Sequence, residues 1–163
     1  MNKFIGHMSP VPDLVDTFKN FARKDRLSAI ALEAQGFYRA AAFHYHQGAE
    51  MLIKSKIVKE LTNLSNPNIR ASIYSHNLLD SIGILLDLLP GNQSLKAHII
   101  HQIRNQVLTV AGLRHLSINC RYPAYLPHCD TFMELHIGKQ DCRYLRERLS
   151  VLAEFIKQLN ILS

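Results

Sequence analysis

Tryptophan is absent from the 163-residue sequence, and only three cysteines occur. Cys120, Cys129 and Cys142 are odd in number and form no Cys-x-x-Cys pair, so they give no sign of a disulfide framework. The simplest interpretation is a reduced, cytoplasmic protein. The longest apolar cluster, at 82–89, is interrupted by Asp87 and is too short to span a bilayer, and the first residues contain no long apolar run. We therefore expect neither a signal peptide nor a membrane anchor.

Several catalytic motifs are also missing. The chain has no glycine-rich phosphate loop, no His-Glu-x-x-His motif and no Gly-x-Ser-x-Gly motif, so kinase, zinc protease and serine hydrolase activities lack support. No segment alternates between apolar and polar residues for long enough to predict a strand, and there is no internal repeat. The sequence gives no reason to expect a cofactor.

The composition is that of a globular protein, with 47% hydrophobic and 20% charged residues. The length fits one domain, which we place at 1–163 with 1–12 as an extended lead-in. The net charge of +6 and the isoelectric point near 9.4 favour an anionic partner, such as a nucleotide, RNA or an acidic protein. A solvated basic surface is the alternative interpretation.

Apolar side chains recur with helical spacing in five segments. We expect helices at 13–35, 36–61, 77–89, 94–116 and 145–159. Asp13 caps the first helix, and Gly36 separates the first two, which therefore form an antiparallel hairpin. Residues 117–138 show no sustained period and are expected to form an ordered but irregular connection. The predicted fold class is all-α, an antiparallel up-and-down bundle of about five helices.

The helix expected at 36–61 is apolar on almost every face, which is typical of a buried central helix. One stripe along it carries Gln47, Glu50 and Lys54 at spacings of three and four, between apolar residues at either end. Buried polar groups need hydrogen-bond partners. This stripe is therefore the first place to look for either a binding site or an internal polar network.

Three separated motifs occur in order along the chain. The first is a helical hairpin at 22–54 that has Ala22, Asp25, Ala29, Leu32, Gly36, Tyr38, Ala41, Phe43, His44, Gln47, Glu50 and Lys54 in register. The second is Ser75-His76-Asn77-Leu78, similar to a Thr-His-Asp-Leu helix start, and the third is Arg121-Tyr122-Pro123 before the last helix. Together they resemble the HEPN superfamily (higher eukaryotes and prokaryotes nucleotide-binding domain). Gly48 and Ala124 depart from the family pattern.

The resemblance implies a helical bundle that often dimerises and acts as a non-catalytic nucleotide-binding or protein-interaction module, as an accessory to a nucleotidyltransferase or a toxin–antitoxin-type partner. The alternative that it implies is a metal-independent ribonuclease, which the family marks by an Arg followed four to six residues later by His. Arg70 and His76 satisfy this spacing. In that mechanism Arg70 positions phosphate and His76 transfers the proton of the 2′-hydroxyl. Because the pair precedes the third helix, whereas the family keeps its pair on a later one, we expect no catalytic residues.

Two interpretations of the polar stripe stay open. In the first, a phosphate-bearing ligand binds where the stripe meets the Arg-Tyr-Pro loop, through His44, Gln47, Glu50, Lys54, Arg121 and Tyr122. In the second, Glu50 and Lys54 satisfy one another as an i,i+4 pair that fixes helix register. Arg121 then anchors the loop to the bundle.

Two further expectations concern metals and assembly. His98 and His101 could share a metal with His128 and Cys129, but the spacings match no known ligand pattern, so we expect no metal site. The many leucines and isoleucines exceed what one small core is expected to hide, so we expect a homodimer.

Overall fold

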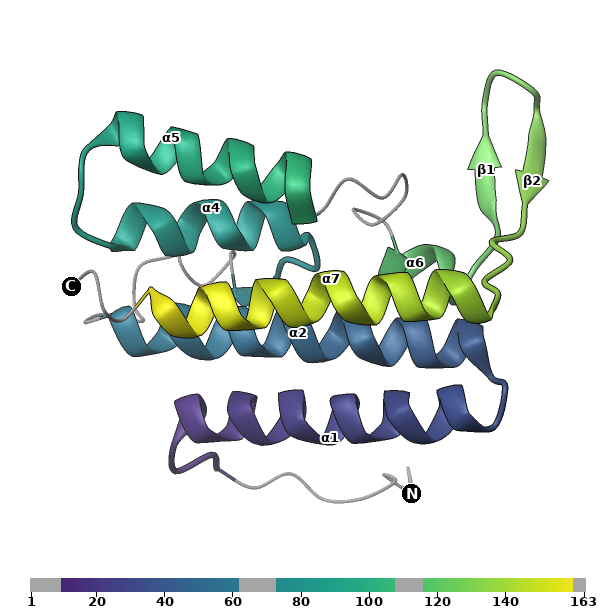
Figure 1. Cartoon of the computed structure of the whole chain (residues 1–163), viewed down its shortest axis with the longest axis horizontal. Helices are drawn as coiled ribbons and strands as arrows, with labels where there is room; N and C mark the ends of the chain where they lie inside the picture. Colours follow the sequence, from purple (N-terminus) through teal and green to yellow (C-terminus); the bar gives the residue numbers. More distant parts are fainter. Residues whose placement is uncertain (1–9, 62–72, 108–115, 160–163) are drawn as a thin grey trace, which may run out of the picture.

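The computed structural model describes residues 10–61, 73–107 and 116–159 (Figure 1). Within these ranges five helices have ten or more residues: α1 (Leu14–Ala34), α2 (Tyr38–Glu60), α4 (Leu78–Leu88), α5 (Gln93–Gln102) and α7 (Lys139–Gln158). The predicted all-α bundle is confirmed. Neighbouring helices α1 and α2 are antiparallel, as are α4 and α5, whereas α7 runs in the same direction as α2 (Figure 1). None of the described helices is long and apolar enough to cross a membrane.

The α1–α2 hairpin forms where the sequence predicts it. Asp13 caps α1 by accepting a hydrogen bond from the backbone N–H of Asp16 at 2.9 Å. Gly36 lies in the short connection after α1 and has a φ of +83°, a left-handed conformation that favours glycine. The N–H of Phe37 then returns to the carbonyl of Leu32 at 2.9 Å, which closes the end of α1.

Helix α2 is the centre of the bundle and contacts α1, α4 and α7. Its sequence is apolar on several faces because each of these helices packs against a different one. The core consists of buried side chains from α2, α4 and α7, including Ala42, Ile53, Ile57, Leu78, Ile82, Leu85, Leu145, Leu149, Leu152 and Ile156. This arrangement confirms the prediction of a central buried helix.

Gly48 lets α1 and α2 approach closely. A Cβ atom added at this position would lie 3.2 Å from the carbonyl oxygen of Ala22 and 3.6 Å from the backbone nitrogen of Arg26. A contact at 3.2 Å is tighter than nine in ten real Cβ contacts, and the neighbouring atom belongs to the backbone. The close packing of α1 against α2 therefore explains why a glycine stands at position 48, where the sequence departs from the family pattern.

The segment after α5 differs from the predicted continuous helix at 94–116. Helix α5 ends at Gln102 and passes into a π-helical turn, η1 (Ile103–Val107). Residues 108–115 lie outside the described part of the chain. A short helix, α6 (Leu116–Asn119), follows.

A small β-hairpin occupies part of the connection that was expected to be irregular. Strands β1 (Ala124–Leu126) and β2 (Thr131–Met133) pair antiparallel, with Tyr125 opposite Phe132. The hairpin projects away from the helices (Figure 1). Three-residue strands are too short to show an alternating pattern, so this element could not be predicted from periodicity.

Candidate functional site

The polar stripe of α2 contains a buried ion pair. The Glu50 carboxylate is fully buried, and its Oε1 accepts a hydrogen bond from Lys54 Nζ at 2.5 Å. The same oxygen lies 2.9 Å from Nδ1 of His76, a residue just before α4. In the sequence His76 belongs to a different motif from this stripe, whereas the structure brings His76 and the stripe together. The charge of Lys54 is neutralised inside the protein.

The contact with Glu50 determines which nitrogen of the His76 ring donates a hydrogen bond. A carboxylate oxygen accepts hydrogen bonds, so Nδ1 is the nitrogen that donates and Nε2 is left for another partner. Asn77 holds this turn by accepting a hydrogen bond from the N–H of Leu79 at 3.1 Å. The other oxygen of Glu50, Oε2, is buried without a hydrogen-bond partner among the described residues. Arg70, the other residue of the ribonuclease hypothesis, lies outside the described ranges.

Arg121 lies at the far end of the stripe, packed against aromatic rings. Its guanidinium carbon is 5.4 Å from the ring centroid of Phe43 and 5.5 Å from that of Tyr122. These are cation–π distances. Both Arg121 and Tyr122 are exposed, so this cluster lies on the surface.

A residue not singled out in the sequence, Arg39, holds the loop that carries Arg121. Its Nε donates to the carbonyl of Cys120 at 2.9 Å, and one terminal nitrogen pairs with Glu134 after the β-hairpin. Burial raises the pKa of the neighbouring Cys120 thiol to about 11, so this cysteine stays protonated at neutral pH. A basic residue in the first turn of a helix, where cations are unfavourable, is the sequence signal that could have pointed to Arg39.

The predicted ligand-binding residues fall into three clusters. Glu50 and Lys54 are with His76, whereas Arg121 lies over the rings of Phe43 and Tyr122. The third, His44, pairs with Asp25 of α1 at 2.8 Å and also meets the Phe43 ring edge-on, with the ring centroids 5.4 Å apart. Phe43 and Lys54 are eleven positions apart, which corresponds to about 16 Å along a helix. Gln47 is partly buried between the two ends of the stripe.

The residues of the metal hypothesis do not form a ligand set. His98, His101, His128 and Cys129 are exposed. Across 10–61, 73–107 and 116–159, no group of three or more His, Cys, Asp or Glu side chains could hold a metal ion.

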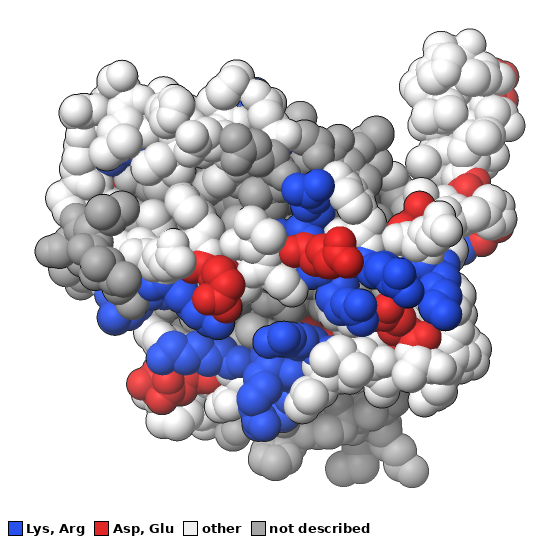
Figure 2. All heavy atoms as spheres, in the orientation of Figure 1, with Lys and Arg blue, Asp and Glu red and all other residues white. Residues whose placement is uncertain are grey.

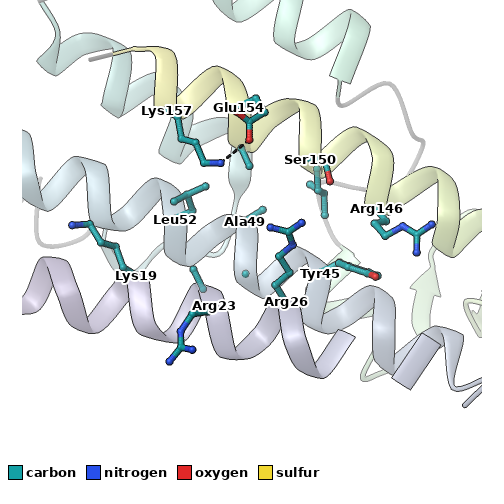
Figure 3. Close-up of a pocket in the computed structure, with 14 residues that line it drawn as sticks. Lys19, Arg23, Arg26, Tyr45, Ala49, Leu52, Arg146, Ser150, Glu154 and Lys157 are labelled. Carbon is teal, nitrogen blue, oxygen red and sulfur yellow. Dashed lines mark hydrogen bonds and ion pairs between the residues drawn. The ribbon is translucent and has the colours of Figure 1, made fainter. Parts of the chain in front are cut away.

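A second candidate site, which the sequence did not predict, is a trough of about 280 Å³ between α1, α2 and α7 (Figure 3). Five of its lining residues are cationic: Lys19, Arg23, Arg26, Arg146 and Lys157. Figure 2 shows that lysine and arginine side chains gather along the seam between α1 and α7. We call this feature the basic trough. It combines residues from three helices, so no single stretch of sequence displays it.

Glu33 binds two residues that line the basic trough, Tyr45 and Arg146. Its carboxylate accepts hydrogen bonds from Arg146 of α7 at 3.1 and 3.2 Å and from the hydroxyl of Tyr45 at 2.7 Å. Burial, followed by the hydrogen bond to Glu33, raises the pKa of Tyr45 to about 12. The tyrosine is thus a hydrogen-bond donor at physiological pH and no candidate base.

The fold is that of a helical-bundle module, and the comparison with protein families shows to which family of such modules the chain belongs. The model of the HEPN domain matches residues 15–159. The chain therefore belongs to the HEPN family, as its three motifs indicated. No curated protein and no solved structure matched the chain. Family membership supports, in general terms, a nucleotide-binding or ribonuclease-type module.

Proposed function

We propose that this protein is a non-catalytic HEPN module that binds a nucleotide or another phosphate-bearing ligand beside the Arg121 loop. The observation that carries this proposal is the position of Arg121, an exposed residue whose guanidinium lies within cation–π distance of the rings of both Phe43 and Tyr122. A planar guanidinium suits phosphate oxygens, and an exposed tyrosine ring offers a surface for a base.

The surroundings favour Arg121 over Lys54 as the phosphate ligand. The ammonium group of Lys54 is buried and paired with Glu50, whereas Arg121 lies at the surface. Arg39 fixes the backbone of the loop through the carbonyl of Cys120. A preorganised loop loses less conformational freedom when the ligand binds. In this proposal the buried ion pair of Lys54 and Glu50 stabilises the fold and does not contact the ligand.

Calorimetric titration with ATP tests the proposal. We expect Arg121→Met to weaken binding by about ten- to a hundredfold, because a charge-assisted hydrogen bond is lost. Arg143→Met is the matched control, since Arg143 is an exposed arginine on α7 outside both candidate sites. Absence of ATP binding in the wild type, or equal loss in both variants, would refute the proposal.

The contact between Glu50 and His76 favours one second candidate, the metal-independent ribonuclease. A carboxylate that fixes the tautomer of a histidine is an arrangement found in general-base catalysis. The mechanism needs Arg70 for the phosphate and His76 for the 2′-hydroxyl proton. We expect no RNA cleavage by the isolated protein in EDTA. Cleavage that disappears in both Arg70→Ala and His76→Ala would replace our proposal with this one.

The proposed module acts as a homodimer and serves a protein partner such as a nucleotidyltransferase or a toxin–antitoxin-type protein. HEPN domains often dimerise. Large exposed apolar side chains support this assembly, notably Phe21 and Leu27 on α1 and Phe132 on the β-hairpin. Light scattering is expected to give twice the chain mass of 18.6 kDa. A monomer mass at micromolar concentration would contradict it. The cytoplasmic location and the single-domain organisation stay predictions.

A further inference from the structure

The cations of the basic trough outnumber the carboxylates that pair with them. Lys157 pairs with Glu154 at 2.6 Å, and Lys19 and Arg146 pair with acidic residues outside the lining. Arg23 and Arg26 form no ion pair with any carboxylate of the described ranges. Figure 3 shows Arg26 reaching from α1 toward α7, while Arg23 points away from α7. Positive charge therefore remains along the α1 side of the trough.

The floor of the basic trough is apolar and aliphatic, with small residues between two leucines. It is lined by Ala22, Gly48, Ala49, Leu52, Leu149 and Ala153. Of the described lining residues, Tyr45 is the aromatic one, and it is buried with its hydroxyl bound to Glu33. The floor thus accepts aliphatic side chains but presents no open ring on which a nucleic-acid base could stack.

From this combination we propose that the basic trough is a docking surface for an amphipathic helix of a partner protein. The apolar face of that helix enters the trough, and glutamates or aspartates along one flank lie beside Arg23 and Arg26. Docking of an amphipathic helix into an apolar groove is a common mode of peptide recognition, and complementary charge sets its orientation.

The spacing of the charges fits a helical partner. Lys19, Arg23 and Arg26 occupy positions i, i+4 and i+7 on one face of α1. At 1.5 Å per residue they extend over about 10 Å, which is the distance that carboxylates at i, i+4 and i+7 cover on a partner helix lying along α1. The basic residues of α1 and the acidic residues of the partner helix can therefore face one another over two helical turns.

The basic trough is distinct from the proposed phosphate site. On α2 the trough is lined by 45, 48, 49 and 52, whereas the polar stripe follows 43, 47, 50 and 54. At about 100° per residue these two sets lie on opposite faces of the helix. Substitutions in one site leave the other intact, so failure of one proposal is distinguishable from failure of the other.

Fluorescence anisotropy with a labelled peptide tests the charge complementarity. The probe is a helical peptide of about 18 residues with leucines and alanines on one face and glutamates at i, i+4 and i+7 on the flank. We expect Arg26→Glu to weaken binding at least about tenfold, and Lys24→Glu to leave it unchanged. Lys24 is an exposed cation on the same helix and lies outside the trough.

Exchange of the charges separates specific docking from general attraction to a basic protein. A peptide with lysine in place of each glutamate is expected to bind Arg26→Glu more tightly than the wild type. Equal weakening by Arg26→Glu and Lys24→Glu, or no binding of the acidic peptide to the wild type, would overturn the proposal. Binding of oligouridylate that depends on Arg26, without binding of the peptide, would show a nucleic-acid surface instead.

A second pair of variants tests the apolar floor without changing charge. Ala153→Leu fills part of the trough and is expected to weaken peptide binding, whereas Ala31→Leu, at an exposed position of α1 outside the trough, is not. Circular dichroism confirms that both variants are folded. Unchanged binding in a folded Ala153→Leu protein would exclude the trough as the docking surface.

Discussion

Glu33 and Arg146 are 113 positions apart in the chain and form an ion pair at 3.1 Å between the end of α1 and the middle of α7. Tyr45 of α2 donates its hydroxyl to the same carboxylate at 2.7 Å. One acidic residue thereby connects the three helices that form the basic trough.

Glu33→Gln is expected to destabilise the protein by about 1–2 kcal/mol, because it removes the charge that Arg146 and Tyr45 share while the sites stay partly exposed to water. Chemical denaturation in urea measures the change. Glu147→Gln serves as the control, since Glu147 is exposed on α7 and forms none of the ion pairs of the described residues. Equal stability of the two variants would show that the connection contributes nothing.

Alkaline pH is expected to destabilise the fold through Tyr45. Its pKa is about 12 in the folded protein, whereas the ordinary value of 10.0 applies to the unfolded chain. As the pH rises, the unfolded chain therefore loses the phenolic proton first. The stabilising contribution is therefore complete below pH 10 and is lost as the pH rises toward 12. In Tyr45→Phe, denaturation midpoints should fall less steeply between these pH values. An identical pH dependence in both proteins would contradict the assignment.

Two glycine substitutions should have opposite effects. Gly48→Ala places a methyl group 3.2 Å from the Ala22 carbonyl and forces α1 away from α2, at a cost of about 1–3 kcal/mol. Gly83→Ala, within α4, meets no atom within 4 Å and should stabilise by about 0.5–1 kcal/mol through helix propensity. Thermal unfolding of both variants decides the matter. A neutral Gly48→Ala would show that the hairpin can relax.

The buried pair gives a prediction of non-additivity. Lys54→Met leaves the Glu50 carboxylate buried with His76 as its remaining partner and should cost about 3–5 kcal/mol. Glu50→Gln together with Lys54→Met removes both charges and should recover much of that loss. Urea denaturation of the single and double variants measures the coupling. Additive losses would mean that the two side chains act independently.

The first two helices were predictable from the sequence because their signals are local, whereas the helix predicted at 94–116 changes to a π-helical turn after Gln102. Asp13 caps α1 and Gly36 ends it, and the apolar pattern of the next segment gave the buried central helix. The contact between Glu50 and His76 was not predictable, since it joins residues 26 positions apart across a stretch without a regular pattern. In the same way, Lys19, Arg23 and Arg26 share a face of α1 by their spacing, but nothing in that spacing says that α7 lies opposite.

The common direction of α2 and α7 has an electrostatic consequence. The two carboxyl ends lie at the same end of the bundle (Figure 1), so their partial negative charges add instead of cancelling. Each of these helices has a lysine in its last turn, Lys59 in α2 and Lys157 in α7. Such cations contribute about 0.3–1 kcal/mol each when they face a helix carboxyl end. A lysine at each of these ends therefore offsets part of the repulsion between two neighbouring helix ends that carry the same sign of partial charge.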